Sequence, residues 1–402
     1  MKTSNRVNNI HYSSTVALKH DVERRKARGE NIIDLGLGEV KFGQPPEFTK
    51  ALISVAKKGV NEYTYAGGTE EIRSVIAQAN NSLFGGVYKN KIVQPRYDKE
   101  EIIHCTSAKL LISAAAYSVA EVNDDVIVLA PFWTPYIDAL KFMGINPVIA
   151  KTRFENNFTP SQDILERSLT RKSKAILINS PNNPSGRVFT KKELEVVYNF
   201  AKKHDLLIIS DEVYDTIIFG GHVHRSIASL SKEAAKRTVV IKGLSKGFGM
   251  GGLRFGYAMS KNEKIIGAMT RVISNTITAP PSLLQEAAEA LFSKSVRHTL
   301  KVTKNYEKRA NFTMKRFQEM KLLFAHVEGA IYIFPKVSPF FSKGIKNSRD
   351  FAARLVEETG IVIHGEPCGY DDHVRIALIQ DIPVLKKAWD KLETFLQKYA
   401  KA

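Results

Sequence analysis

Short apolar runs alternate with longer amphipathic stretches through the middle of the chain, from Glu101 onward. Each apolar run has the length of a β-strand, and the stretches between the runs repeat their apolar residues at helical spacing. In the segment 191–204, for example, Leu194 and Val197 fall on one face of a helix with Phe200 and Ala201. This alternation is typical of a mostly parallel sheet with crossover helices, so the central chain is expected to be α/β.

Seven of the apolar runs are candidate strands of one sheet. They are residues 102–105, 126–129, 147–150, 175–178, 206–209, 238–241 and 255–258. Nearly all of their residues are apolar, as expected of strands that helices cover on both faces. The predicted fold class is α/β, with a seven-stranded, mostly parallel sheet flanked by helices.

The pattern changes after about Leu284, where long helices come first and short apolar segments follow at 330–334, 361–363 and 374–377. This indicates a second, smaller α+β lobe. We expect a large domain over residues 45–284 and a small domain formed by residues 1–44 plus 285–402. Since no Gly/Ser-rich linker separates the two, they are expected to pack closely, with the small domain closing over a cleft.

Composition excludes several other classes of protein. No apolar run is long enough to cross a bilayer, and the first ten residues lack the apolar core of a secretory signal. The two cysteines, Cys105 and Cys368, form neither a disulfide framework nor a zinc pattern. We therefore expect a cytoplasmic protein with no metal and no membrane partner.

The formal net charge of +18 leaves nucleic-acid binding to be considered. The basic residues are dispersed in pairs, however, and no run of five occurs. That distribution is typical of solvated helix faces, so no nucleic-acid partner is expected.

Polar residues directly after apolar strands are the first candidates for a site, because ligands of an open α/β sheet bind beyond the carboxyl ends of the strands. Asp211 and Lys246 follow two such runs, and Asn183 lies in the loop after a third. Together the three could hold one cofactor from one side. Taken singly, Asp211 could be a helix N-cap, Asn183 a turn former and Lys246 a surface amine.

Four segments occur in the order found in one family. They are Asn-Ser-Pro-Asn-Asn-Pro-Ser-Gly at 179–186, Ser-Asp-Glu-Val-Tyr at 210–214, Gly-Leu-Ser-Lys at 243–246 with Gly-Gly-Leu-Arg at 251–254, and His-Val-Arg at 373–375. With these segments the chain resembles the fold-type-I, class I and II aminotransferases, most nearly the aspartate aminotransferase branch, along essentially its whole length. The resemblance implies a pyridoxal-phosphate (PLP) enzyme that moves an amino group between an L-amino acid and a 2-oxo acid such as 2-oxoglutarate.

The resemblance implies a role for each matching residue around the PLP ring. Lys246 would bind PLP as a Schiff base and, once released, would move the substrate's α-proton. Asp211 would pair with the pyridine nitrogen, while Asn183 and Tyr214 would hydrogen-bond the phenolic oxygen. Trp133 would stack on the ring, although a core tryptophan is a plausible alternative.

The resemblance also implies a phosphate site at the start of a helix, where backbone NH groups and the helix dipole favour an anion. Its residues would be Ser107, Ala108, Lys109, Ser245, Arg254 and, from a neighbouring subunit, Tyr63. A homodimer with shared active sites is therefore expected. Gly243 stands where many relatives carry a phosphate-binding serine, so the full set of phosphate ligands stays open.

Substrate binding is assigned in the same way. Arg375 would bind the α-carboxylate through its bidentate fork, and the main chain of Gly38 would approach that carboxylate. Trp133 and Asn183 would also touch the substrate. Trp133 and the segment 13–18 suggest an acidic substrate such as aspartate, but His11, Tyr12 and Leu253 depart from common patterns and leave the amino donor open.

Two other functions stay open at this point. A PLP-dependent β-lyase, or another PLP reaction, would use the same residues on the same scaffold. A non-catalytic, basic DNA-binding protein is a remote alternative that the net charge alone supports. The resemblance further implies cis peptide bonds at Ala130-Pro131 and Asn183-Pro184.

Overall fold

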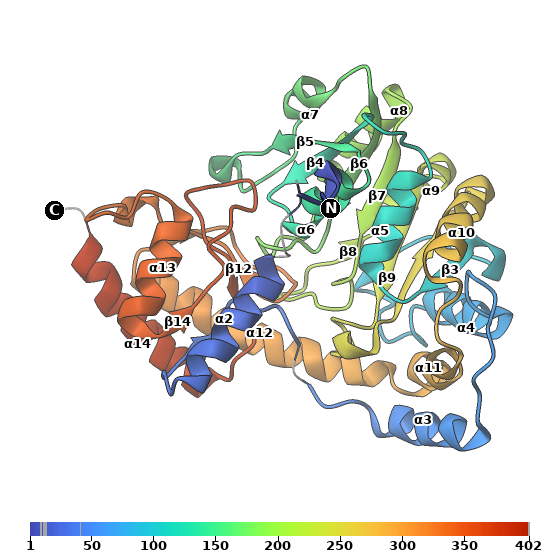
Figure 1. The fold of residues 1–402 in the computed structure, drawn as a ribbon, viewed down its shortest axis with the longest axis horizontal. Helices are drawn as coiled ribbons and strands as arrows, with labels where there is room; N and C mark the ends of the chain where they lie inside the picture. The colour runs from blue at the N-terminus through green and yellow to red at the C-terminus, as the bar shows by residue number, and fades with distance from the viewer. Residues whose placement is uncertain (9, 11–13, 41, 401–402) are drawn as a thin grey trace.

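A computed structural model describes residues 1–8, 10, 14–40 and 42–400 of the 402-residue chain. Two groups of elements lie side by side in it (Figure 1). One is a layered α/β body around a large sheet. The other is a smaller helical group that contains both the first long helix, α2 (Ser14–Ala27), and the C-terminal helix, α14 (Ile382–Tyr399).

The large sheet has seven strands, in the order β3-β10-β9-β7-β6-β4-β5. Only β10 is antiparallel to its neighbours, β3 and β9. The predicted seven-stranded, mostly parallel sheet is therefore confirmed, with every strand at its predicted place. The strands are β3 (Ile102–Cys105), β4 (Asp125–Ala130), β5 (Asn146–Lys151), β6 (Ser173–Asn179), β7 (Leu207–Asp211), β9 (Thr238–Gly243) and β10 (Gly256–Met259).

Helices cover both faces of the sheet. Successive side chains of a strand point to opposite faces, so each strand packs against helices on both sides. In β4, Val126 and Val128 pack in one apolar cluster with α5 (Ala108–Tyr117), α6 (Pro135–Phe142) and α10 (Glu263–Ile277). Ile127 and Leu129 pack in another cluster with α7 (Gln162–Ser168) and α8 (Lys191–Lys203). The apolar face predicted for 191–204 is the buried face of α8.

A further cluster joins α3 (Pro46–Lys58), α4 (Glu70–Asn81) and α11 (Ser282–Lys294) to β3, β9 and β10. The smaller group has a core of its own, which brings Ile33 and Leu35 together with Trp389. Its helices are α12 (Val296–Glu319), α13 (Ser348–Thr359) and α14. Strand β1 (Ile33–Asp34) pairs with β14 (Ile361–Val362), and β12 (Tyr332–Ile333) pairs with β15 (Ile376–Ala377). The remaining helices and strands are α1 (Asn5–Asn8), β2 (Ile92–Val93), β8 (His224–Arg225), α9 (Lys232–Arg237), β11 (Leu323–Phe324) and β13 (Pro335–Lys336).

Helix α12 is 24 residues long and belongs to two cores. Val296 at its start packs with α11, whereas Val302 and Phe317 further along pack in the core of the smaller group. Figure 1 shows the helix running between the two groups. In the described part of the chain, no helix has both the length and the apolar character needed to cross a bilayer.

Buried charged groups fix the segment that follows β7. The Lys242 amine on β9 lies 2.7 Å from the Asp215 carboxylate and donates to Gln94 Oε1 over 2.5 Å. Glu212 is bound in turn by His224, at 3.0 Å, and by the Ser226 hydroxyl, at 2.8 Å. The backbone between Glu212 and Asp215 is thus held from β8 and β9 at once.

The buried Lys242–Asp215 pair predicts that loss of Lys242 lowers the free energy of unfolding more than loss of an exposed lysine does. Lys242→Met leaves a buried carboxylate without its cation and should lower the free energy of unfolding by about 3–5 kcal/mol. Lys386→Met breaks the exposed pair with Asp390 on α14 and should cost less than about 0.5 kcal/mol. Urea unfolding of both variants measures the difference; equal costs would show that the buried pair does not stabilise the fold.

Candidate active site

The carboxyl ends of β6, β7 and β9 bring three of the predicted residues together. Asp211 ends β7, Asn183 follows β6, and Lys246 lies three residues after β9. The Lys246 amine lies 5.6 Å from the centre of the Tyr214 ring and interacts electrostatically with Asp211. It donates to the carbonyl oxygen of Gly38 over 2.6 Å, so Gly38 joins the same cluster from the N-terminal part of the chain.

Asp211 is fully buried, and that burial raises the pKa of its carboxyl from 3.8 to about 6. It accepts a short hydrogen bond from the Tyr136 hydroxyl and another from the backbone NH of Val213, at 3.3 Å. Both bonds favour the charged form but only partly offset the loss of water. Such a carboxyl would be stabilised in its charged form by a ligand cation placed beside it.

Tyr136 had not been assigned to the site from the sequence. It lies one helical turn after Trp133, and the two rings meet edge to face at 5.4 Å and 89°. That spacing is the one signal in the sequence that places the Tyr136 hydroxyl near the residues Trp133 contacts.

Arg375 is a buried cation without a carboxylate. Its guanidinium is 1% exposed, donates to the Gly36 carbonyl over 2.9 Å and approaches Asn183 Oδ1 at 3.4 Å. Among the described residues it forms no ion pair within 4.0 Å, and its Nε has no hydrogen-bond partner. Burying an unpaired charge is costly, so the arrangement favours binding of an anion at Arg375.

Tyr332 was also missed, because an aromatic residue in the apolar run 330–334 looks like part of the core. The hydroxyl of Tyr214 donates to that of Tyr332 over 3.1 Å, and the Arg375 guanidinium lies 4.9 Å from the Tyr332 ring. A Cβ placed on Gly38 would lie 1.7 Å from the Tyr332 hydroxyl oxygen. No residue with a side chain therefore fits at position 38 without a shift.

The residues predicted for a phosphate lie at the start of α5. Ser107 caps that helix by accepting from the backbone NH of Leu110 over 3.2 Å. Lys109 lies 5.9 Å from the Trp133 ring; partial loss of water around its amine lowers the pKa of that amine, which the Asp138 carboxylate opposes and the Arg254 charge reinforces. Ala108 lies against Gly256, where a Cβ would come within 2.4 Å of the Ala108 nitrogen.

The departure at Gly243 has a structural reason. A Cβ on Gly243 would lie 2.8 Å from the Phe255 carbonyl oxygen, which explains why no serine stands there. Arg254 has a φ of +58° and is exposed, with its guanidinium on the carbonyl of Gly251 at 2.9 Å. Ser245 lies in contact range of Gly251 and is partly buried.

Tyr63 is placed apart from this cluster, on the surface between α3 and α4, where it is 89% exposed. Within one chain, then, the structure gathers the predicted residues except Tyr63. Of the segment 13–18, Ser13 lies outside the described residues, as do His11 and Tyr12. The cis peptide bonds expected at Ala130-Pro131 and Asn183-Pro184 are confirmed, and Ser180-Pro181 is also cis.

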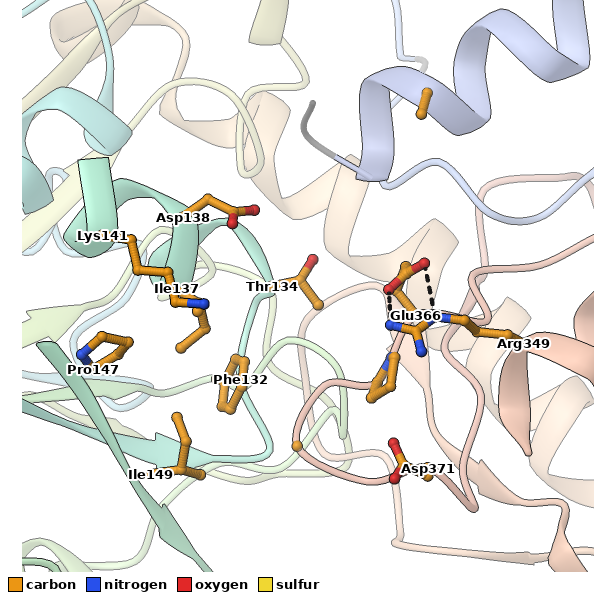
Figure 2. A pocket seen from close by; sticks show the side chains of 13 residues that line it. Phe132, Thr134, Ile137, Asp138, Lys141, Pro147, Ile149, Arg349, Glu366 and Asp371 are labelled. Carbon is orange, nitrogen blue, oxygen red and sulfur yellow. Dashed lines mark hydrogen bonds and ion pairs between the residues drawn. The ribbon is translucent and has the colours of Figure 1, made fainter. Parts of the chain in front are cut away.

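A cavity of about 710 Å³ lies beside the cluster, between the two groups of elements (Figure 2). Figure 2 shows Ile137 and Asp138 of α6 on one side and the Arg349–Glu366 ion pair, at 2.8 Å, on the other. Its lining includes Phe132 and Thr134, which flank Trp133, but not Lys246, Asp211 or Arg375. The cavity therefore lies next to the segment that carries Trp133 and does not contain the buried groups.

Comparison with known proteins decides the family. A model of the family described as Aminotransferase class I and II matches residues 30–392. The chain belongs to this family.

Individual relatives resemble this aminotransferase over their whole length. The asparagine–oxo-acid transaminase of Streptococcus mutans serotype c is 34% identical over 99% of this chain and 100% of its own. The aspartate aminotransferase of Bacillus subtilis is 32% identical, with 100% of both chains covered. The crystal structure of the aspartate aminotransferase of Thermotoga maritima has a TM-score of 0.88 at 30% identity and covers 98% of this chain and 100% of its own. The chain is thus a transaminase with the fold of the aspartate aminotransferases.

The burial of Asp211 predicts a pH dependence of stability in the ligand-free aminotransferase. Because its folded pKa lies above 3.8, the folded state loses stability as pH rises from about 4 to about 6, by up to about 3 kcal/mol. Asp211→Asn keeps an acceptor for Tyr136 and removes this loss. The thermal midpoint of the variant should therefore rise relative to wild type across this pH window and stay level above it.

Thermal midpoints at pH 4.5, 6 and 8 measure the effect, with the exposed Asp163→Asn as control. A difference between wild type and Asp211→Asn that does not change with pH would contradict a raised pKa at Asp211.

Proposed function

We propose that this transaminase uses PLP bound through Lys246 to move an amino group between an L-amino acid and a 2-oxo acid such as 2-oxoglutarate. The observation that carries the proposal is that one cluster contains both a buried cation and a buried carboxyl, each of which a ligand of opposite charge would stabilise. Arg375 is a buried cation that forms no ion pair with any residue the structure describes, and Asp211 is a buried carboxyl that a cation would stabilise. An amino acid and a pyridinium ring together supply both charges.

The residues present fit PLP in their chemistry. Lys246 offers a primary amine for an imine, Asp211 a carboxylate for the pyridine nitrogen, and Trp133 a flat face for the ring. The start of α5, with Lys109 and Ser107, offers NH groups and a cation for the phosphate. When bound, PLP supplies a conjugated ring that accepts the electron pair of the broken Cα–H bond.

The protein residues then have separate tasks. Asp211 would keep the proton on the ring nitrogen, because a buried carboxylate and a cation stabilise each other. Tyr214 and Asn183 would donate to the phenolic oxygen. The amine of Lys246 would serve as the base that moves the substrate's α-proton, and its partly buried place beside Tyr214 would limit exchange of that proton with water.

Substrate orientation falls to Arg375 and Gly38. The guanidinium fork binds the α-carboxylate with two hydrogen bonds, a geometry that a lysine cannot reproduce. The main chain of Gly38 lies against the Lys246 amine, so it borders the space where the Cα–H bond would sit. The side chain of the substrate would extend toward Trp133 and the cavity beside it.

We propose aspartate and asparagine as the first amino donors to test, since relatives that are 34% and 32% identical to this chain carry these names. We further propose that residues 45–284 form the PLP-binding domain and that residues 1–44 with 285–402 close over it. The Lys246–Gly38 hydrogen bond places residues of the two parts side by side, whereas α11, which the boundary at 284 divides, packs on the large sheet. Two unpaired thiols, Cys105 and Cys368, support a reducing location such as the cytoplasm.

A homodimer with shared sites is part of the same proposal. Tyr63 is a large aromatic side chain that is almost wholly exposed in one chain, and that chain has no side-chain donor at Gly243. Tyr63 of a second copy would supply it.

The cofactor proposal predicts a visible absorbance band, between about 300 and 500 nm, in the purified protein supplied with PLP. Aspartate or asparagine should bleach it, borohydride should fix the cofactor to the chain, and Lys246→Ala should abolish both effects. Lys264→Ala, on the exposed face of α10, is the matched control and should behave as wild type. A protein that takes up no PLP would contradict the proposal.

The same assay separates transamination from β-elimination. Transfer to 2-oxoglutarate produces glutamate and regenerates the band. Pyruvate and ammonia released from a cysteine conjugate, with no 2-oxo acid present, would instead show a β-lyase.

Shared sites predict complementation between two inactive variants. Tyr63→Ala should weaken PLP binding at the neighbour's site, and Lys246→Ala should inactivate its own. Refolded mixtures of the two contain hybrid dimers with one intact site, so about a quarter of wild-type activity should return. No activity above that of the separate variants would show that Tyr63 does not act across an interface.

A further inference from the structure

Tyr332 touches three residues of the active site that lie far apart in the sequence. It is buried on β12, with its hydroxyl beside that of Tyr214 and its ring under the guanidinium of Arg375. Its hydroxyl oxygen also closes the space above Gly38.

The hydroxyl pair has a definite polarity. In the structure Tyr214 donates its single proton to Tyr332 over 3.1 Å, and the rings meet at 80° with their centres 5.9 Å apart. When Tyr214 donates to the phenolic oxygen of PLP, that proton is no longer available to Tyr332. Since a phenol is both donor and acceptor and its proton rotates, the pair survives by reversing, with Tyr332 donating to Tyr214.

Reversal makes Tyr214 a stronger donor. Hydrogen bonds in a buried chain polarise one another, so a phenol that accepts a proton donates its own more strongly. Both rings are buried, which keeps water from replacing Tyr332 as the donor. The hydroxyl of Tyr332 thus acts on the cofactor through Tyr214.

The ring of Tyr332 acts on the other half of the site. Arg375 lies with its guanidinium 4.9 Å from the ring centre, while Gly36 and Asn183 accept from its two terminal nitrogens. An aromatic face attracts a cation and restrains its plane. The guanidinium fork is therefore held in one orientation before a carboxylate arrives, which lowers the entropic cost of binding.

We propose that Tyr332 is a positioning residue that serves both halves of the site, orienting Arg375 with its ring and donating to Tyr214 with its hydroxyl. This inference rests on the proposed use of PLP. It assigns the two actions to different atoms of one side chain, so different substitutions separate them.

Tyr332→Phe removes the hydroxyl and keeps the ring, whereas Tyr332→Leu and Tyr332→Met remove both. The matched control is Tyr306→Phe, because Tyr306 is buried in the same core and has the Arg309 guanidinium, not that of Arg375, 5.0 Å from its ring. Two quantities are measured on the holoenzyme: the pH midpoint of its visible absorbance change, and the dissociation constant of maleate, an unreactive dicarboxylate.

Tyr332→Phe should raise the pH midpoint by about 0.5 unit, because a weaker donor at the phenolic oxygen lets the linkage to Lys246 keep its proton to higher pH. Its maleate dissociation constant should change less than about threefold. Tyr332→Leu and Tyr332→Met should raise that constant about tenfold, since the face under Arg375 is lost. Tyr306→Phe should leave both quantities unchanged.

An unchanged pH midpoint in Tyr332→Phe, or wild-type maleate binding in either variant without the ring, would overturn the inference. So would equal shifts in Tyr306→Phe, which would show a general effect of the core. A wild-type protein with no visible band would overturn the use of PLP itself, a result that is distinct from all of these.

Discussion

The ion pair between Lys242 and Asp215 fixes the spacing on which the site depends. Lys242 lies four residues before Lys246, and Asp215 directly follows Tyr214. Their contact therefore sets the distance between the strand that leads to the Lys246 amine and the segment that carries Asp211 and Tyr214. The sheet brings the strand ends to one edge, but hydrogen bonds between strands alone do not hold the segments beyond that edge. The Lys242–Asp215 ion pair holds these segments, and because the pair is buried, solvent and salt screen it little.

Much of this arrangement could be read from the sequence because its signals are local. A strand covered on both faces must be apolar throughout, which made all seven strands of the large sheet visible as runs. Polar residues at the ends of those runs, Asp211 and Lys246 among them, stood out against that background. Gly243 was recognised as a departure from the family pattern and Gly38 as a match to it. The structure adds the atoms that exclude a side chain, Phe255 O at Gly243 and Tyr332 Oη at Gly38.

The contacts that the sequence did not reveal join segments far apart in the chain. Tyr136 and Tyr332 each pack in an apolar cluster, so their hydroxyls gave no sign of pairing with Asp211 and Tyr214. The bond from Arg375 to Gly36 spans 339 positions. Such partners follow from how the smaller group packs on the sheet, which no periodicity within one element encodes.

Helix α12 connects the two groups of elements as one continuous helix. With 24 residues it is about 36 Å long, and its two ends are embedded in different cores. A turn of only about 5° at the end near α11 would move the far end by about 3 Å, comparable with the length of the hydrogen bond from Lys246 to Gly38. If the two groups close as proposed, the helix would act as a rigid arm, and substitutions where it meets α11 would change how far the amine and Gly38 separate without touching either.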